Sequence, residues 1–182
     1  AITRNSLASP QVFGINAGAS LAIVVATILF PELYSKTTVY FSFLGSALGG
    51  ITVYLFASGG KVTHIKLALA GMAVHLFLSS LTQGVIVLNE DATDVLYWLV
   101  GSINGKNWSH VLVLLPWSVF GLLAAFIMGR SISILVLGEN MATGLGEKVQ
   151  WIRLVAGVIV IILAGSSVAV AGPIGFIGLM VP

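Results

Sequence analysis

The chain has 182 residues, of which 58% are hydrophobic and only 8% are charged. Soluble domains average roughly 45–50% apolar and 25% charged residues, and a chain of this length cannot bury so much apolar surface in water, so we predict a membrane protein. The sequence has no cysteine, which excludes disulfides and thiolate metal sites, and its net charge of +2, carried by scattered basic residues, does not favour a nucleic acid partner.

Five apolar runs reach the length of about 20 residues that a helix needs to cross a bilayer. We predict an all-α, polytopic bundle in which residues 1–182 form one transmembrane domain, with part of a sixth span after Ala171-Gly172-Pro173. The shorter segment Asp91–Gly101 is typical of an interfacial or re-entrant helix. Because the chain begins without an initiator Met and ends directly after an apolar run, we expect an internal fragment of a longer protein. The five predicted spans are Val12–Phe30, Thr38–Ser58, Leu67–Leu88, His110–Met128 and Ile152–Val170.

Small residues recur four positions apart in the first two predicted spans. Gly14 and Gly18 form one GxxxG spacing, and Gly45 and Gly49 form another. In lipid, such spacings allow the backbones of two helices to approach closely. The pattern favours a packed helical bundle and indicates nothing more specific.

The Lys and Arg residues between the spans predict the orientation of the chain. If successive spans alternate in direction, six basic residues lie on one side of the membrane and two on the other. Cytoplasmic loops carry an excess of Lys and Arg, so we expect the side with six to be cytoplasmic. The six are Arg4, Lys61, Lys66, Arg130, Lys148 and Arg153, and the two are Lys36 and Lys106.

One polar, glycine-rich stretch, Gly129–Lys148, separates two long apolar runs, and we expect it to be a cytoplasmic loop. It is the best candidate in the sequence for receiving energy or a signal. A phosphate-binding loop of the GxxxxGK[ST] type is absent, because Gly59-Gly60-Lys61 continues with Val62 and lacks the upstream glycine. If nucleotide drives this protein, another subunit must bind it.

His75 lies inside the third predicted span, and Ser79 and Ser80 follow one turn later. A polar residue at membrane depth suggests a transport pathway, and a simple hydrogen bond to a neighbouring helix is the alternative. His64 and His110 lie in a loop and at an interface, where a solvated role is expected. We find no metal-ligand cluster, and we predict no metal site, no cofactor and no catalytic residue.

Four blocks resemble the FecCD family, the membrane permeases of ATP-binding-cassette (ABC) importers for iron–siderophore complexes, haem and cobalamin. The first is Asn5-Ser6-Leu7-Ala8-Ser9-Pro10 with Gly14 and Gly18-Ala19-Ser20, similar to NPLAxP…G…GAx except that Ser6 replaces the usual proline. The others are Leu67–Gly71 (LxLAG), Leu137–Gly146 (LGExxAxxLG) and Val168–Pro182 (VAxAGPIGFIGLxVP). The last block is long and specific, and the blocks occur in family order along the whole chain.

The resemblance implies a non-enzymatic, multi-pass permease subunit in the plasma (inner) membrane, as part of a protein of about ten spans. It implies as partners an ABC-type ATPase, an extracytoplasmic substrate-binding protein, a second permease copy or paralogue, and a metal-chelate substrate. It implies two short helices that contact the ATPase, and an inner gate at Thr63, His64 and Ile65. The ATPase-coupling residues are Gly138, Glu139, Asn140, Met141, Ala142, Thr143, Gly144, Leu145 and Gly146.

Two other functions are alternatives to a permease subunit of an ABC importer. A secondary transporter of a small solute is the first alternative, but no carboxylate lies within a predicted span, which weakens a proton-coupled carrier. An intramembrane enzyme would need paired catalytic groups at one depth, and the sequence offers only His75 with Ser79 or Ser80.

Overall fold

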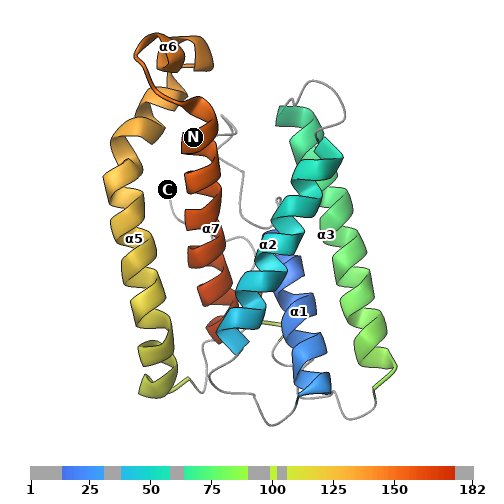
Figure 1. The fold of residues 1–182 in the computed structure, drawn as a ribbon. Coiled ribbons are helices and arrows are strands. Elements are labelled where there is room, and N and C mark those ends of the chain that lie inside the picture. The colour runs from blue at the N-terminus through green and yellow to red at the C-terminus, as the bar shows by residue number, and fades with distance from the viewer. Residues whose placement is uncertain (1–13, 31–37, 58–63, 90–98, 102–105, 175–182) are drawn as a thin grey trace.

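The computed structural model describes residues 14–30, 38–57, 64–89, 99–101 and 106–174. In this part of the chain all regular structure is helical, which confirms the predicted all-α class (Figure 1). The helices are α1 (Ile15–Leu29), α2 (Thr38–Ala57), α3 (His64–Val87), α5 (Trp108–Val136), α6 (Glu139–Gly144) and α7 (Val149–Ala171).

Four of these helices, α2, α3, α5 and α7, are long and apolar enough to cross a membrane. The remaining predicted span, Val12–Phe30, contains α1, an apolar helix of 15 residues. The long helices alternate in direction, so that the ends of α2 and α5 and the starts of α3 and α7 lie at the same end of the bundle as α6 (Figure 1). This arrangement places Lys66, Arg130, Lys148 and Arg153 at one end and Lys106 at the other.

The two GxxxG spacings face each other where α1 crosses α2. A Cβ atom added at Gly18 would collide with the backbone carbonyl of Gly45, and one added at Gly45 would collide with the carbonyl of Gly18. A Cβ at Gly49 would lie only 2.5 Å from the carbonyl oxygen of Gly14. The backbones are therefore in direct contact, and only residues without a side chain allow this approach.

The other side of α2 packs against α7 and brings α5 into the bundle. The hydroxyl of Ser42 on α2 donates a buried hydrogen bond of 2.6 Å to the carbonyl oxygen of Gly165 on α7. Phe43 contacts Trp117 of α5 edge to face, with ring centroids 4.8 Å apart. The packing of α5 is mainly against α7 and α6, while α3 lies on the far side of the bundle against α1 and α2.

The structure corrects the predicted end of the fourth span. We expected the helix to end at Met128 and the loop to begin at Gly129, but α5 continues through Gly129 and Arg130 to Val136. A single glycine lowers helix stability by only about 1 kcal/mol, and Ile132 and Leu135 gain buried contacts by extending the helix. Most of Asp91–Gly101 and most of the sixth run lie outside the described residues.

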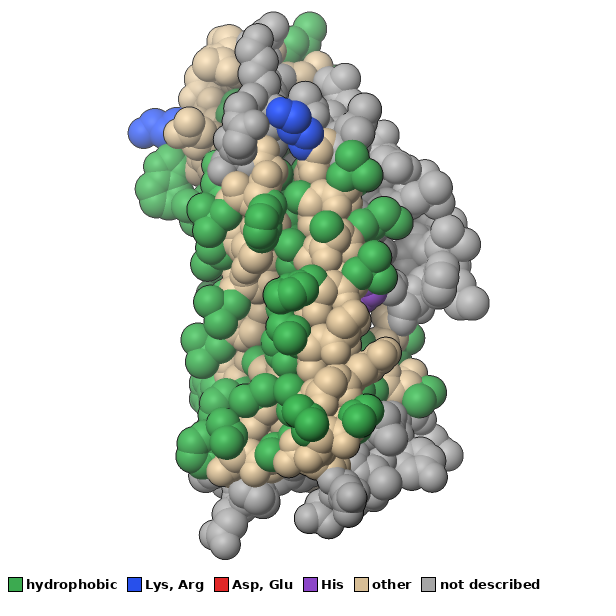
Figure 2. All heavy atoms as spheres, turned by 90° about the vertical axis from the view of Figure 1, so that its right-hand side faces the viewer, with side chains coloured by type: hydrophobic (Ala, Val, Ile, Leu, Met, Phe, Trp, Pro, Cys, Tyr) green, Lys and Arg blue, Asp and Glu red, His purple; other side chains and the backbone are tan. Residues whose placement is uncertain are grey.

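The outer faces of the helices are covered by large apolar side chains. Figure 2 shows hydrophobic side chains along the described part of one face, with the Lys and Arg side chains that can be seen there towards its upper end. On α3, Leu69, Met72, Leu76 and Phe77 are all about 60% exposed. An apolar exterior with charges at the end is the surface of a membrane-embedded bundle.

Candidate functional site

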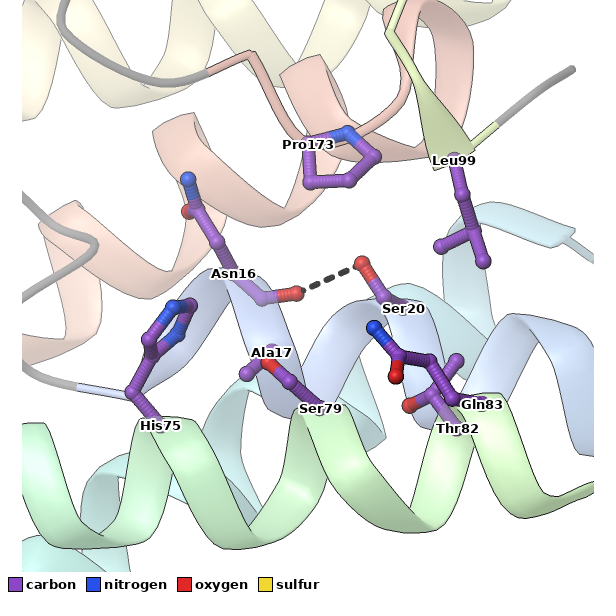
Figure 3. Close-up of a pocket in the computed structure, with 9 residues that line it drawn as sticks. All are labelled: Asn16, Ala17, Ser20, His75, Ser79, Thr82, Gln83, Leu99 and Pro173. Carbon is purple, nitrogen blue, oxygen red and sulfur yellow. Dashed lines mark hydrogen bonds between the residues drawn. The ribbon is translucent and has the colours of Figure 1, made fainter. Parts of the chain in front are cut away.

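A cavity of about 230 Å³ lies between α1 and α3, near the middle of α3 (Figure 3). Of the nine described residues that line it, six are polar, although the surrounding helix surfaces are apolar. Figure 3 shows the side chains of both helices around a common space, with Leu99 and Pro173 on its far side. The lining residues are Asn16, Ala17, Ser20, His75, Ser79, Thr82, Gln83, Leu99 and Pro173.

The first turns of α1 contribute Asn16 and Ser20, which are four residues apart and so share one face of the helix. Gly18 lies on another face, where it contacts α2. The hydroxyl of Ser20 donates a hydrogen bond of 2.9 Å to the backbone carbonyl oxygen of Asn16. The glycine contact with α2 therefore turns the amide of Asn16 and the hydroxyl of Ser20 towards α3.

The contribution of α3 is a polar stripe in which His75, Ser79, Thr82 and Gln83 follow at helical spacing. Thr82 donates its hydroxyl to the carbonyl oxygen of Leu78 at 2.8 Å, within its own helix. Nδ1 of His75 is buried and has no hydrogen-bond partner among the described residues, and the same holds for Oδ1 of Asn16. The cavity thus contains one unsatisfied polar atom from each of the two helices.

Of the three residues predicted to border a pathway, His75 and Ser79 line this cavity. Ser80 is exposed and is not among the lining residues, because one residue further along a helix turns the side chain by about 100°. The sequence did not lead us to predict the other four polar residues of the lining, Asn16, Ser20, Thr82 and Gln83. Their signal was available as polar residues three or four positions apart within apolar runs.

The predicted inner gate is described only in part. Thr63 lies outside the described residues, and His64 and Ile65 are the first two residues of α3. They occupy the end of the bundle at which α6 lies (Figure 1). Their role as a gate stays a prediction.

A second site is the short segment between α5 and α7, which contains one six-residue helix, α6, instead of two helices. Gly138, with φ 121°, precedes α6, and Gly146, with φ 82°, follows it. L side chains rarely adopt these backbone angles, so glycine permits both sharp turns. The backbone N–H of Ala142 donates to the carbonyl of Gly138 (2.9 Å), and that of Glu147 donates to the carbonyl of Ala142 (3.0 Å).

Ala142 anchors α6 to the bundle. It is completely buried against Leu135 of α5 and Ile152 of α7. Two large apolar side chains of the same segment point outwards instead, with Met141 62% exposed and Leu145 65% exposed. The segment therefore has a buried face that fixes it to two long helices and an apolar face available to a partner.

Known proteins resemble the whole of this chain. The model of the FecCD transport family matches residues 1–182. The Fe(3+)-citrate import system permease protein YfmD of Bacillus subtilis (strain 168) is 54% identical over 182 residues, which are all of this chain and 54% of that protein. The ferric enterobactin transport system permease protein FepD of Escherichia coli (strain K12) is 38% identical over 186 residues, covering all of this chain and 55% of FepD.

A solved structure has the same fold. The inward-facing conformation of a metal-chelate type ABC transporter aligns with a TM-score of 0.81 at 26% sequence identity, over 98% of this chain and 58% of that one. The chain spans about half the length of the curated relatives it matches. A whole-chain family match and four apolar helices of spanning length define a multi-pass membrane protein, and the chain belongs to the FecCD transport family.

Proposed function

We propose that this protein is the permease subunit of an ABC importer that carries an iron–siderophore complex or a related metal chelate into the cytoplasm. Family membership and the iron-chelate permeases among its relatives support this function. In this proposal the protein is not itself an enzyme, and a separate ATPase subunit hydrolyses ATP. The protein lies in the plasma membrane with α6 on the cytoplasmic side, in agreement with the excess of basic residues at that end.

The main observation in support of the proposal is which residues are buried and which are exposed in the segment from Gly138 to Gly146. Its buried residue, Ala142, contacts both α5 and α7, while Met141 and Leu145 are exposed. An ATPase that binds the exposed apolar pair pushes on Ala142 and therefore on the ends of two long helices at once. This is the mechanical link that an importer needs between nucleotide hydrolysis and helix movement.

Transport then follows an alternating-access cycle. Movement of the coupling segment rearranges the bundle, and Thr63, His64 and Ile65 open or close the cytoplasmic end. His75, Ser79 and Ser80 on α3 border the path. An extracytoplasmic binding protein delivers the chelate, and a second permease copy or paralogue completes the path.

The test is uptake of radioactive iron by cells that express the full-length protein with its partner subunits. We expect these cells to grow on one or more members of a panel of single ferric chelates, including ferric citrate. We also expect them to lose iron uptake when the ATPase gene is deleted. Uptake that persists without the ATPase, and that stops when the ion gradient is dissipated with ATP intact, would instead identify a secondary transporter.

A further inference from the structure

Two buried polar atoms of residues that line the cavity between α1 and α3 have no partner in the part of the chain that the structure describes. Oδ1 of Asn16 and Nδ1 of His75 are buried without a hydrogen-bond partner in the described part of the chain, and both residues line the cavity. Buried polar groups in folded proteins are almost always hydrogen-bonded, to protein or to ordered water. These two atoms therefore point to an occupant of the cavity.

The size and chemistry of the cavity identify the class of this occupant. A water molecule occupies about 30 Å³ in the liquid, so a space of about 230 Å³ accommodates a cluster of several waters. Among the described residues, those that line the cavity carry amides, hydroxyls, one imidazole and apolar groups, and none of them is Asp, Glu, Lys or Arg. Such a lining hydrogen-bonds neutral molecules and does not balance the charge of a bound ion.

The position of the polar residues gives water a route into the bundle. His75 lies at the middle of α3, and Ser79 and Gln83 continue the same face towards the end of the helix that is remote from α6. Gln83 is exposed, so the stripe reaches from the buried Nδ1 of His75 to the surface. Polar groups at membrane depth are tolerated where they are buried in protein or line a water-filled cavity.

We infer that this cavity is a hydrated site within the membrane-spanning bundle, in which bound water hydrogen-bonds to Asn16 Oδ1 and His75 Nδ1. It is a hydrated space beside the proposed path. This inference deepens the pathway part of the proposed function. The experiments below measure water in the cavity and not transport. The inference can therefore be wrong while transport is present, or right while transport is absent.

The first experiment uses the reaction of an introduced thiol with a charged methanethiosulfonate reagent, which requires a thiolate in contact with water. Ser79→Cys places the thiol in the cavity, in the full-length protein with its partners, reconstituted in lipid nanodiscs and free of other reactive cysteines. Ser166→Cys is the matched control, because Ser166 on α7 is 1% exposed and is not among the lining residues. We expect modification of Ser79→Cys to be at least tenfold faster, and equal rates would overturn the inference.

A blocking variant shows whether the reagent reaches Ser79 through the cavity. Ala17 is 4% exposed and lines the same space, so Ala17→Leu fills part of it. Combined with Ser79→Cys, this change should slow modification several-fold if the cavity contains the water. An unchanged rate would mean that the reagent reaches Ser79 from the outer surface of α3, and the inference would be wrong.

Thermal unfolding gives a second, independent measurement that needs no cysteine variant. Asn16→Leu replaces the amide by an apolar group of similar size. If the cavity is dry, this change removes an unsatisfied polar atom and raises Tm. If water satisfies Asn16, the change removes hydrogen bonds and Tm stays the same or falls, which is the expected result. A clear rise in Tm would overturn the inference.

Discussion

The hydroxyl of Ser131 on α5 donates a hydrogen bond of 3.0 Å to Oε1 of Glu147, in the turn between α6 and α7. The backbone N–H of Glu147 donates at the same time to the carbonyl of Ala142 in α6. One residue thus holds α6 by its backbone and α5 by its side chain. Together with the burial of Ala142, this bond fixes the orientation of α6 relative to the last turns of α5.

Loss of this bond should loosen the coupling of ATP hydrolysis to transport. Ser131→Ala removes the donor and leaves a partly exposed carboxylate that water can solvate, so we expect a change of about 1 kcal/mol in the placement of α6 and a bundle that still folds. The measurement is iron taken up per ATP hydrolysed in proteoliposomes, which should fall several-fold. Ser133→Ala is the control, because the hydroxyl of Ser133 donates to the carbonyl oxygen of Gly129 in its own helix (2.9 Å) and its loss should leave this ratio unchanged.

The exposed apolar pair on the coupling segment should determine the affinity for the ATPase. We expect Met141→Ser and Leu145→Ser each to weaken binding of the ATPase by more than about 1 kcal/mol, as truncation of a central interface anchor does. Titration of the purified ATPase against the permease in detergent measures this affinity. Leu154→Ser changes an equally exposed leucine on α7, outside the segment, and an equal loss in that control would contradict the assigned surface.

Ala142 should tolerate no enlargement, since it is completely buried between α5 and α7. Ala142→Leu adds three carbon atoms to a closed space, and overpacking of this kind typically costs about 1–3 kcal/mol. We expect α6 to move off the bundle and ATPase-driven uptake to be lost, while the helix content by circular dichroism is retained. Gly157→Ala on α7, outside the segment, is the control, because an added Cβ there meets no atom within 4 Å, and normal uptake is expected.

The crossing of α1 and α2 should be the part of the bundle most sensitive to a single methyl group. Gly18→Ala directs a Cβ into the carbonyl of Gly45, and neither backbone can give way without separating the helices. We expect a loss of roughly 1–3 kcal/mol or more, seen as a lower Tm in detergent. Gly84→Ala, where the added Cβ meets nothing within 4 Å, should leave Tm nearly unchanged. Equal Tm values for the two variants would contradict the close crossing.

Much of the architecture was predictable because hydropathy acts locally. The runs around Thr38–Ala57, His64–Val87 and Val149–Ala171 were predicted within three residues at each end, since about 20 apolar residues define a span whatever the neighbouring helices do. The end of α5 was predicted wrongly. Gly129 and Arg130 resemble a stop signal in the sequence, but contacts of Ile132 and Leu135 with residues that follow in the chain extend the helix.

The sequence by itself determined the membrane class, the helical runs, the family and the polar segment between α5 and α7, because each is encoded in a contiguous stretch of residues. Only the tertiary structure decided that Asn16 shares a cavity with His75, that Ser79 enters it while Ser80 does not, and that Ala142 is buried while Met141 is exposed. The reason is that composition determines whether a helix lies in lipid, whereas the rotation of each helix is decided by its neighbours. Here the glycine contact of α1 with α2 sets the rotation of α1, and that rotation turns Asn16 towards α3.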